Sequence, residues 1–329
     1  MKSLVFEAPY QVAVQEQTTP EPAPDEILVA TRLSAISPGT EMLVYRGQLP
    51  DELPLDATIA TLAQTTNHYP LRYGYACVGQ VVELGKAVDP GWLGRTVFGF
   101  HPHASHFIAR PETLIPIPQP ISDEQAALYP NVETAVTFLL DGAPAIGERV
   151  VVFGAGIVGL LTTALLSRFP LRELTVIDPF PLRRQLALTL GAHQAYSPDA
   201  MPDALAATAD LTYELSSNPV ALNAAIRCTG FQGRVVIGSW YGQKRAPIDL
   251  GGYFHRSRIR LISSQVSTLP PERSGRWDRA RRTEVAWQML EQIDSANFIT
   301  HRFAVEQAAA AYQRIAQQPA ETVQVLLTY

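Results

Sequence analysis

Short apolar runs separated by proline and glycine fill residues 1–118. Runs with the pattern of strands cover residues 4–6, 26–33, 79–84, 96–100 and 106–109. This spacing is typical of a small antiparallel barrel or sandwich. The segment 51–70 interrupts the strands, and its apolar spacing predicts a helix at about 57–64.

The apolar periodicity becomes helical from Ser122, which Gln125 follows at the spacing of a capping box. Strands and helices then alternate, which predicts the parallel sheet of a doubly wound α/β domain. Helices are predicted from about 181 to 190, closed by Gly191, and from about 219 to 228, closed by Gly230. The remaining predicted elements are strands at 174–178, 211–214, 234–238, 258–263 and 322–327, and helices at 281–293 and 305–316.

Glycines interrupt the apolar run that begins at Arg149, and the run then resumes with helical spacing. Gly154, Gly156 and Gly159 have the G-x-G-x-x-G spacing of a strand, a tight turn and a helix that bind a dinucleotide. A pyrophosphate would lie on the free N–H groups at the start of the helix. The alternative is a glycine-containing turn without a ligand. The predicted contacts are Gly154, Ala155, Gly156, Ile157, Val158 and Gly159.

An acid, Asp178, ends the next apolar strand, about 20 residues after the glycines, where a carboxylate can bind the adenosine ribose hydroxyls. Its charge would repel a 2′-phosphate, which favours NAD over NADP. Pro179 and Arg183 belong to the same predicted site. Arg183 and Arg184 could instead bind a phosphate, or simply lie on the solvent side of the next helix.

The chain of 329 residues is 47% hydrophobic and 17% charged, enough for a sizeable core and two domains. A net charge of -5 argues against nucleic-acid binding. The two cysteines exclude a disulfide framework and a four-cysteine zinc site, and they fit a reducing, cytoplasmic setting. No apolar run approaches a membrane span, and the first residues lack the pattern of a signal peptide.

The order of a barrel, a nucleotide-binding domain and a returning last strand resembles the medium-chain dehydrogenase/reductase superfamily, the relatives of zinc alcohol dehydrogenase. Within it, the segments 36–41, 47–50, 69–71, 74–75 and 78–82 look most like the bacteriochlorophyllide a dehydrogenase branch. The resemblance implies an α/β protein with a GroES-like β-barrel catalytic domain (1–118, completed by 299–329) and a Rossmann domain (119–298). It also implies a small-molecule substrate and a homodimer.

The residues at the family's zinc positions depart from the pattern. Zinc relatives use a Cys, a His in a Gly-His-Glu motif and a later Cys. Here the first position is Ser37 or Pro38, the second is Tyr75, and the third falls near Pro130 and Asn131. We therefore expect no zinc. His101, His103 and His106 could form a different metal site, line a pocket, or end a strand.

Without a metal, a side chain must handle the proton at the substrate oxygen. The resemblance points to Ser37 and Thr40, at the proton-relay position, to Tyr75, at the lost ligand position, and to His103. Glu41 takes the place of an acid that supports the metal shell, so we expect it to orient a neighbour or to pair with Arg46 or Arg95.

On the cofactor side, Ser216 and Ser217 follow a strand, at a position where this superfamily contacts the ribose groups. Gly238, Ser239 and Trp240 follow the next strand, where ligands bind in open α/β sheets. Trp240 and Tyr241 could flank the nicotinamide, stack on a planar substrate, or pack against a second subunit. Arg256, Arg258 and Arg260 would share one strand face, either as an anion site or as a solvated edge.

These features predict a zinc-independent NAD-linked oxidoreductase that interconverts a secondary alcohol and a ketone, with a large or planar molecule as one candidate substrate. One alternative is an NADPH-dependent enoyl or quinone reductase of the same superfamily. The other is a nucleotide-binding redox sensor that has lost catalysis.

Overall fold

The structure is a computed structural model that describes residues 1–50, 59, 62 and 67–329. The helix predicted at 57–64 lies outside the described residues, apart from Ile59 and Leu62. Contacts divide the chain into two units, one formed by Met1–Pro130 with Asp294–Tyr329 and the other by Asn131–Ile293. The sequence places the same divisions after 118 and 298. We call the first unit the mixed-sheet unit and the second the parallel-sheet unit.

The parallel-sheet unit is built on six strands in the order β10-β9-β8-β11-β12-β13, and all neighbours are parallel. Strand order therefore reverses between β8 and β11, which is the place where ligands bind in doubly wound sheets. The strands are β8 (Arg149–Phe153), β9 (Glu173–Ile177), β10 (Gln194–Tyr196), β11 (Ala209–Glu214), β12 (Thr229–Ile237) and β13 (Arg260–Ser263). The predicted α/β, doubly wound fold class is confirmed.

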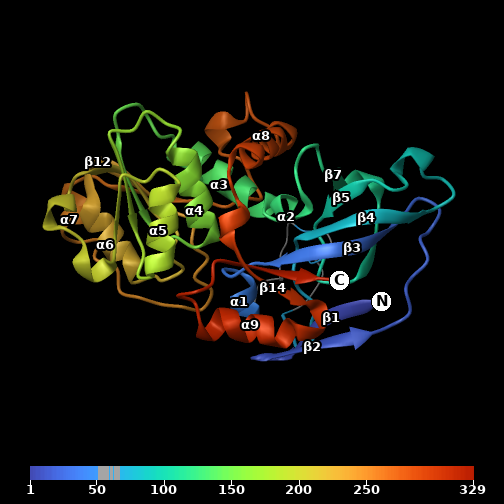
Figure 1. The fold of residues 1–329 in the computed structure, drawn as a ribbon. Coiled ribbons are helices and arrows are strands. Elements are labelled where there is room, and N and C mark those ends of the chain that lie inside the picture. The colour runs from blue at the N-terminus through green and yellow to red at the C-terminus, as the bar shows by residue number, and fades with distance from the viewer. Residues whose placement is uncertain (51–58, 60–61, 63–66) are drawn as a thin grey trace. The chain divides into compact units, whose positions relative to one another are not determined.

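Helices cover this sheet because each connection between parallel strands must cross over it. In Figure 1, α4 and α5 lie against the strands, with α4 contacting β8 and β9 and α5 contacting β9 and β10. Helix α6 contacts β8, β11 and β12. The helices are α3 (Tyr129–Gly142), α4 (Ile157–Leu166), α5 (Pro181–Thr189), α6 (Ala221–Cys228), α7 (Tyr253–Arg256) and α8 (Arg279–Gln292).

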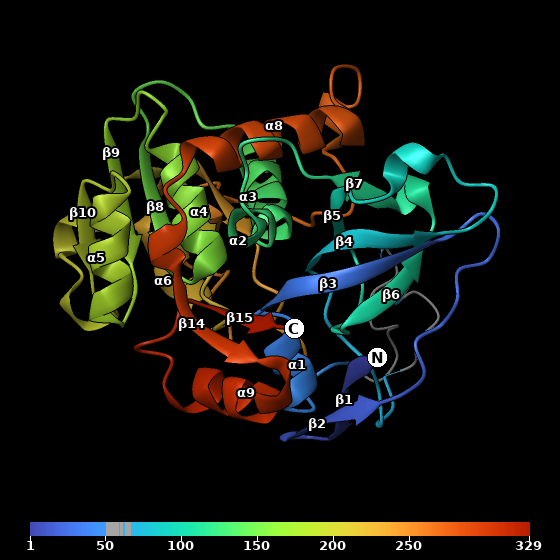
Figure 2. The same cartoon turned by 45° about the vertical axis from the view of Figure 1, so that its right-hand side comes forward.

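The mixed-sheet unit contains a seven-stranded sheet in the order β14-β15-β3-β4-β5-β7, with β6 also pairing with β3, and a separate β1–β2 hairpin. Figure 2 shows β15 beside β14 and β3. The last strand therefore joins the first unit, as the sequence predicts. The strands are β1 (Lys2–Ala8), β2 (Gln11–Glu16), β3 (Ile27–Ile36), β4 (Cys77–Leu84), β5 (Thr96–Gly99), β6 (His106–Ala109), β7 (Leu114–Pro116), β14 (Ile299–Ala304) and β15 (Gln324–Thr328).

Among its described residues, this unit also has the helices α1 (Glu41–Tyr45), α2 (Asp123–Ala126) and α9 (Ala308–Gln317). The predicted capping box is confirmed at α2, where Ser122 and Gln125 bond each other's backbone N–H groups. Helix α9 contacts α1 and β2. The ring of Tyr312 on α9 packs edge-on against Phe6 at 5.2 Å and stacks on Tyr45 at 5.5 Å. This aromatic packing points the Tyr312 hydroxyl inward.

Some local predictions are wrong. Gly230 does not close α6, because the helix ends at Cys228 and Gly230 lies inside β12. Arg256, Arg258 and Arg260 do not share a strand face: Arg256 ends α7, Arg258 turns with φ +54°, and only Arg260 belongs to β13. The sequence also misses β2, β7 and β10. Strand β10 has three residues, too few for a period to be detected.

Candidate functional site

The turn after β8 needs glycine at Gly154 for two reasons. Its φ is +94°, a conformation that glycine adopts without strain. A Cβ there would lie 2.6 Å from the carbonyl carbon of Leu215 and from the Cα of Ser216. The chain after β8 therefore passes directly against the chain after β11, where the strand order reverses.

The other two glycines of the motif differ in what surrounds them. A Cβ on Gly159 would lie 1.9 Å from the carbonyl oxygen of Gly154, so this glycine lets α4 pack on the turn. Gly156 precedes α4 with φ -65° and ψ -178°, which any residue can adopt, and a Cβ there would have no atom within 4 Å. Protein packing does not require this glycine, whereas close approach of a pyrophosphate to the helix amides does.

The residues between these glycines present backbone rather than side chains. Ala155 and Ile157 are buried and Val158 is half-buried. The N–H of Ala155 donates to Oδ2 of Asp178 over 2.7 Å. The loop is therefore tied to the end of β9 by the acid that the sequence assigns to the ribose.

Asp178 is only 2% exposed, and its second oxygen accepts the N–H of Phe180 over 2.9 Å. The Nη1 atom of Arg183 lies 3.9 Å from Asp178 Oδ2, and its guanidinium lies 4.8 Å from the centre of the Phe180 ring. Arg184 donates to the carbonyl oxygens of Asp178 and Pro179 over 2.8 Å. A carboxylate that would repel a 2′-phosphate thus has a cation nearby. Pro179 itself is exposed.

The loops after β11 and β12 are joined by serine hydroxyls. Ser239 Oγ accepts the N–H of Ser217 over 2.9 Å and donates to the carbonyl oxygen of Glu214 over 3.3 Å. A Cβ on Gly238 would lie 2.2 Å from the ring of Phe138, so packing against α3 alone explains that glycine. Trp240 is 38% exposed. The residues after the carboxyl ends of β11 and β12 are Ser216, Ser217, Gly238, Ser239 and Trp240, and the backbone of Ser216 lies next to Gly154.

The mixed-sheet unit holds a buried carboxylate, Glu41, at the start of α1. Its Oε1 accepts the N–H of Ser37 over 2.8 Å. Its Oε2 lies 2.9 Å from Nε2 of His103 and also accepts the hydroxyl of Tyr312. Burial, and then the charge of Glu41, raises the pKa of Tyr312 well above its usual value, so this phenol stays a donor.

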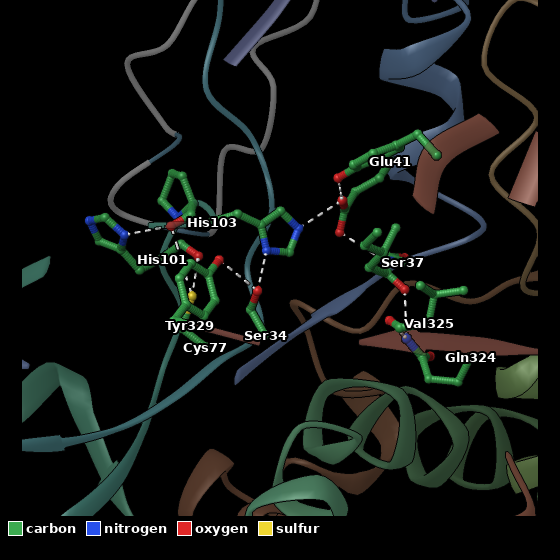
Figure 3. A network of polar contacts seen from close by, with 12 residues as sticks. Ser34, Ser37, Glu41, Cys77, His101, His103, Gln324, Val325 and Tyr329 are labelled. Carbon is green, nitrogen blue, oxygen red and sulfur yellow. Dashed lines mark hydrogen bonds and ion pairs between the residues drawn. The ribbon is translucent and has the colours of Figure 1, made fainter. Parts of the chain in front are cut away.

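Figure 3 shows His103 held between Glu41 and Ser34. His103 Nδ1 lies 2.7 Å from Ser34 Oγ, which lies 3.0 Å from the hydroxyl of Tyr329. The side chains of His103 and Glu41 are 0% exposed. Both imidazole nitrogens are therefore bonded inside the protein. In this arrangement His103 and Glu41 hold other groups in place and do not reach a substrate.

The hydroxyl candidates lie next to this cluster. Ser37 is 9% exposed, and Thr40 is the half-buried residue before α1, with no capping bond from its side chain. Tyr75 is half-buried and packs edge-on against Tyr73 at 6.4 Å. A Cβ on Gly74 would lie 2.4 Å from Cδ2 of His103, so the chain before Tyr75 passes over the imidazole. The pairing of Glu41 with Arg46 or Arg95 is wrong, because the partner of Glu41 is His103.

His101, His106 and Cys77 also belong to the mixed-sheet unit. His101 Nδ1 bonds the carbonyl oxygen of Pro102, and His106 Nδ1 lies 3.1 Å from Ser105 Oγ, so the three histidines face separate partners. Burial lowers the pKa of His101 to about 4. Cys77 is 0% exposed, and burial raises its pKa to about 12, so it is a core residue.

The residues at the zinc positions do not fit that metal. Ser37 or Pro38, Tyr75, and Pro130 or Asn131 supply none of the thiolate, imidazole or carboxylate ligands that zinc prefers. The side chains of that kind nearby, Glu41 and His103, bond each other. Within residues 1–50, 59, 62 and 67–329, no group of three or more His, Cys, Asp or Glu is placed to hold a metal.

Sequence reasoning missed Ser34, Tyr312, Tyr329 and Glu214. The spacing of Ala308, Ala311, Tyr312 and Ile315 marks one buried face of α9 but does not name a partner for the phenol. Glu214 did carry a signal. It is an acid at the end of an apolar strand, the same feature that identified Asp178.

Comparisons with known proteins agree with this architecture. The chain has the two-domain fold of the alcohol dehydrogenases: the structure of 2R,3R-butanediol dehydrogenase from Bacillus subtilis matches with a TM-score of 0.80 and 19% identity, over 100% of this chain and 99% of that one. An alcohol dehydrogenase from Escherichia coli CFT073, solved with NADH, also matches with a TM-score of 0.80, at 20% identity over 100% and 99% of the two chains.

Sequence likeness points the same way. Residues 158–282 match the zinc-binding dehydrogenase family. D-Guloside 3-dehydrogenase from Escherichia coli K12 is 24% identical over the full length of both chains. In fold and in sequence the chain is thus similar to zinc-binding dehydrogenases. Among the described residues, no helix has the length and apolar character to cross a membrane.

Proposed function

We propose that this protein is an NAD(H)-linked oxidoreductase that works without zinc and interconverts a secondary alcohol and a ketone. The observation that carries the proposal is Gly156, which no contact or backbone angle of the protein requires. The space around Gly156 is open at the first amides of the ten-residue helix α4, whereas contacts require the glycines at 154 and 159 on either side of it. Such a space suits a bound pyrophosphate.

The residues that would hold the cofactor come from the carboxyl ends of four strands. The turn 154–159 would take the pyrophosphate, and Asp178, with Pro179 and Arg183 beside it, would face the adenosine ribose. The remaining contacts would be Ser216, Ser217, Gly238, Ser239 and Trp240. A bound NAD would supply the acceptor for the hydride of the alcohol carbon, and the protein would take up the hydroxyl proton and pass it to water.

Zinc independence rests on residue types. None of the positions that carry zinc in the relatives holds a suitable ligand here, and the match to the zinc-binding dehydrogenase family begins at residue 158, beyond all of them. The name of that family therefore does not bear on whether this chain binds zinc.

The protein must still take up the proton that leaves the substrate hydroxyl. Ser37, Thr40 and Tyr75 are the candidate contacts with the substrate oxygen. Glu41 fixes the peptide N–H of Ser37 over 2.8 Å, and His103 and Tyr312 fix Glu41 in turn. Fixing the Ser37 peptide limits where its hydroxyl can lie, and a general acid or base must lie within hydrogen-bond reach of the substrate oxygen.

Substrate size and assembly follow as further parts of the proposal. Tyr75 of the mixed-sheet unit is half-buried and Trp240 of the parallel-sheet unit is 38% exposed, and an aromatic ring of either kind suits a large or planar molecule. The edge strand β13 has one neighbour in its sheet and suits pairing with a second copy. Light scattering would test the homodimer against a monomer mass of 36.0 kDa.

The test is turnover and metal content measured on the same preparation. Purified protein is mixed with NAD and a panel of secondary alcohols, sugar glycosides included, and NADH is followed at about 340 nm. We expect activity with at least one alcohol, unchanged by a chelator, and far less than one zinc per chain by elemental analysis. One zinc per chain with activity lost on chelation would refute zinc independence. Failure of both NADH and NADPH to bind would refute the function.

The second candidate is an NADPH-dependent enoyl or quinone reductase, and Arg183 is the observation that favours it. Its guanidinium, 3.9 Å from Asp178 Oδ2, is close enough to offset the carboxylate and to pair with a 2′-phosphate. Fluorescence titrations with NADH and NADPH separate the two candidates, because a dehydrogenase of the first kind binds NADH more tightly.

A further inference from the structure

A second buried carboxylate, Glu214, lies at the end of the central strand β11 and is 0% exposed. Its Oε1 accepts the N–H of Ser216 over 2.9 Å and also the Ser216 hydroxyl. Its Oε2 accepts the hydroxyl of Tyr241. Burial of a charge costs free energy unless such donors surround it, so this arrangement is specific rather than incidental.

The loop after Glu214 is held in an unusual conformation. Ser217 has φ +58°, which side-chain-bearing residues rarely adopt. Its N–H donates to Ser239 Oγ over 2.9 Å, and its carbonyl oxygen accepts Nζ of Lys244 over 2.8 Å. Backbone strain of this kind persists where the surroundings determine it, and it often lies at ligand sites.

The direction of the hydrogen bonds shows what this cluster offers to a ligand. A tyrosine hydroxyl has one proton and two lone pairs, so Tyr241, which gives its proton to Glu214, has an oxygen that can only accept. Ser216 and Ser239 likewise donate to Glu214 and accept backbone N–H groups. Tyr241 is half-buried, so part of the residue is exposed to solvent.

This cluster stands at the reversal of strand order. The Cα of Ser216 would lie 2.6 Å from a Cβ on Gly154, so the loop that Glu214 organises and the glycine turn form adjoining walls. A dinucleotide carries hydroxyl and amide N–H donors on its sugars and carboxamide, which suit an acceptor at that place.

We propose that Glu214 is a positioning residue for the bound dinucleotide, and that it orients the Tyr241 hydroxyl so that the phenolic oxygen accepts a hydrogen bond from a donor of the cofactor. The inference rests on the proposed function, because it requires that a dinucleotide binds. It assigns roles to two residues, Glu214 and Tyr241, that the glycine motif does not identify.

A double-mutant cycle on the dissociation constant for NADH tests the proposal. Tyr241→Phe should weaken NADH binding by about two- to tenfold, the value of one neutral hydrogen bond. Glu214→Gln should weaken it no more than Tyr241→Phe does, and the double variant should bind NADH like Tyr241→Phe, because Glu214 acts through Tyr241. Tyr253→Phe is the matched control, since that hydroxyl bonds the carbonyl oxygen of Thr229 at the other end of β12.

If Glu214 and Tyr241 were merely structural, the losses of NADH affinity in the two single variants would add in the double variant. Each loss would also follow the loss of unfolding free energy in that variant. A second readout is tyrosinate absorbance in alkali. Burial, and then the neighbouring charge of Glu214, raises the pKa of Tyr241, so Glu214→Gln should lower the pKa of one tyrosine, and this shift should be absent from the double variant. Unchanged NADH binding in Tyr241→Phe would overturn the inference alone. Absence of NADH binding by the unaltered protein would overturn the proposed function and the inference together.

Discussion

Alanine substitutions at Gly156 and Gly159 should have opposite effects on stability and binding. At Gly156 the backbone suits alanine and no atom lies within 4 Å of the new Cβ, so unfolding should change by less than about 1 kcal/mol. At Gly159 the Cβ would lie 1.9 Å from the carbonyl oxygen of Gly154, so α4 must move away. Overpacking of this kind costs about 1–3 kcal/mol.

The effect on binding separates a ligand site from a simple turn. A methyl group at Gly156 occupies the space that we assign to the pyrophosphate. Loss of one hydrogen bond to a charged oxygen costs about 1.5–3 kcal/mol, so the dissociation constant for NADH should rise about tenfold or more. Gly251→Ala is a suitable control, because a Cβ there also has no atom within 4 Å.

Urea unfolding followed by circular dichroism and NADH fluorescence titration measure the two quantities. Gly156→Ala with normal stability and normal NADH affinity would mean that no dinucleotide lies across this turn. Gly159→Ala with the stability of the unaltered protein would show that the packing of α4 on the turn is looser than the distance of 1.9 Å implies.

Further substitutions test the two buried acids and one histidine. Glu41→Gln keeps the size of a 0% exposed side chain but removes the charge that its donors bond, so unfolding in urea should lose about 2–4 kcal/mol; unchanged stability would contradict this role. Asp178→Asn should shift the ratio of NADPH to NADH affinity by about tenfold towards NADPH, and a constant ratio in titrations would show that this acid does not select the cofactor. The pKa of His101 falls from 6.5 to about 4 on folding, so the folded state resists protonation and loses stability as pH drops through that window. His101→Phe, which keeps a ring against Phe107, should remove about 1–3 kcal/mol of this acid sensitivity in urea unfolding between those pH values; an unchanged slope would count against it.

Much of the fold could be predicted because its signals are local. The glycine spacing, the capping box at Ser122 and the apolar strands each depend on a few adjacent residues. Gly230 was misinterpreted because glycine suits both the end of a helix and a strand that passes close to another segment, here the carbonyl oxygen of Ala207. Strand β2 was missed since its residues are half-buried or exposed and show little alternation.

The site was less predictable, because its contacts join residues far apart in the chain. The sequence identified Glu41 and His103 individually, but the pair depends on residues 62 positions apart meeting in the interior of the protein. Tyr312 reaches Glu41 from a helix 271 positions later. The periodicity of apolar residues does not indicate contacts between side chains so far apart in the sequence. The acid at Glu214 was visible, yet its meaning depends on Tyr241, which lies 27 residues further on.

The division of the mixed-sheet unit into 1–130 and 294–329 has a consequence for biosynthesis. Domains tend to fold as units while the ribosome adds about 5–20 residues per second. The parallel-sheet unit is encoded without a break and can be completed first. Until Tyr312 and β15 emerge, β3 lacks a neighbour and Glu41 lacks its phenol donor. A chain that ends at residue 293 should therefore have a folded parallel-sheet unit and a mixed-sheet unit that proteases cleave readily.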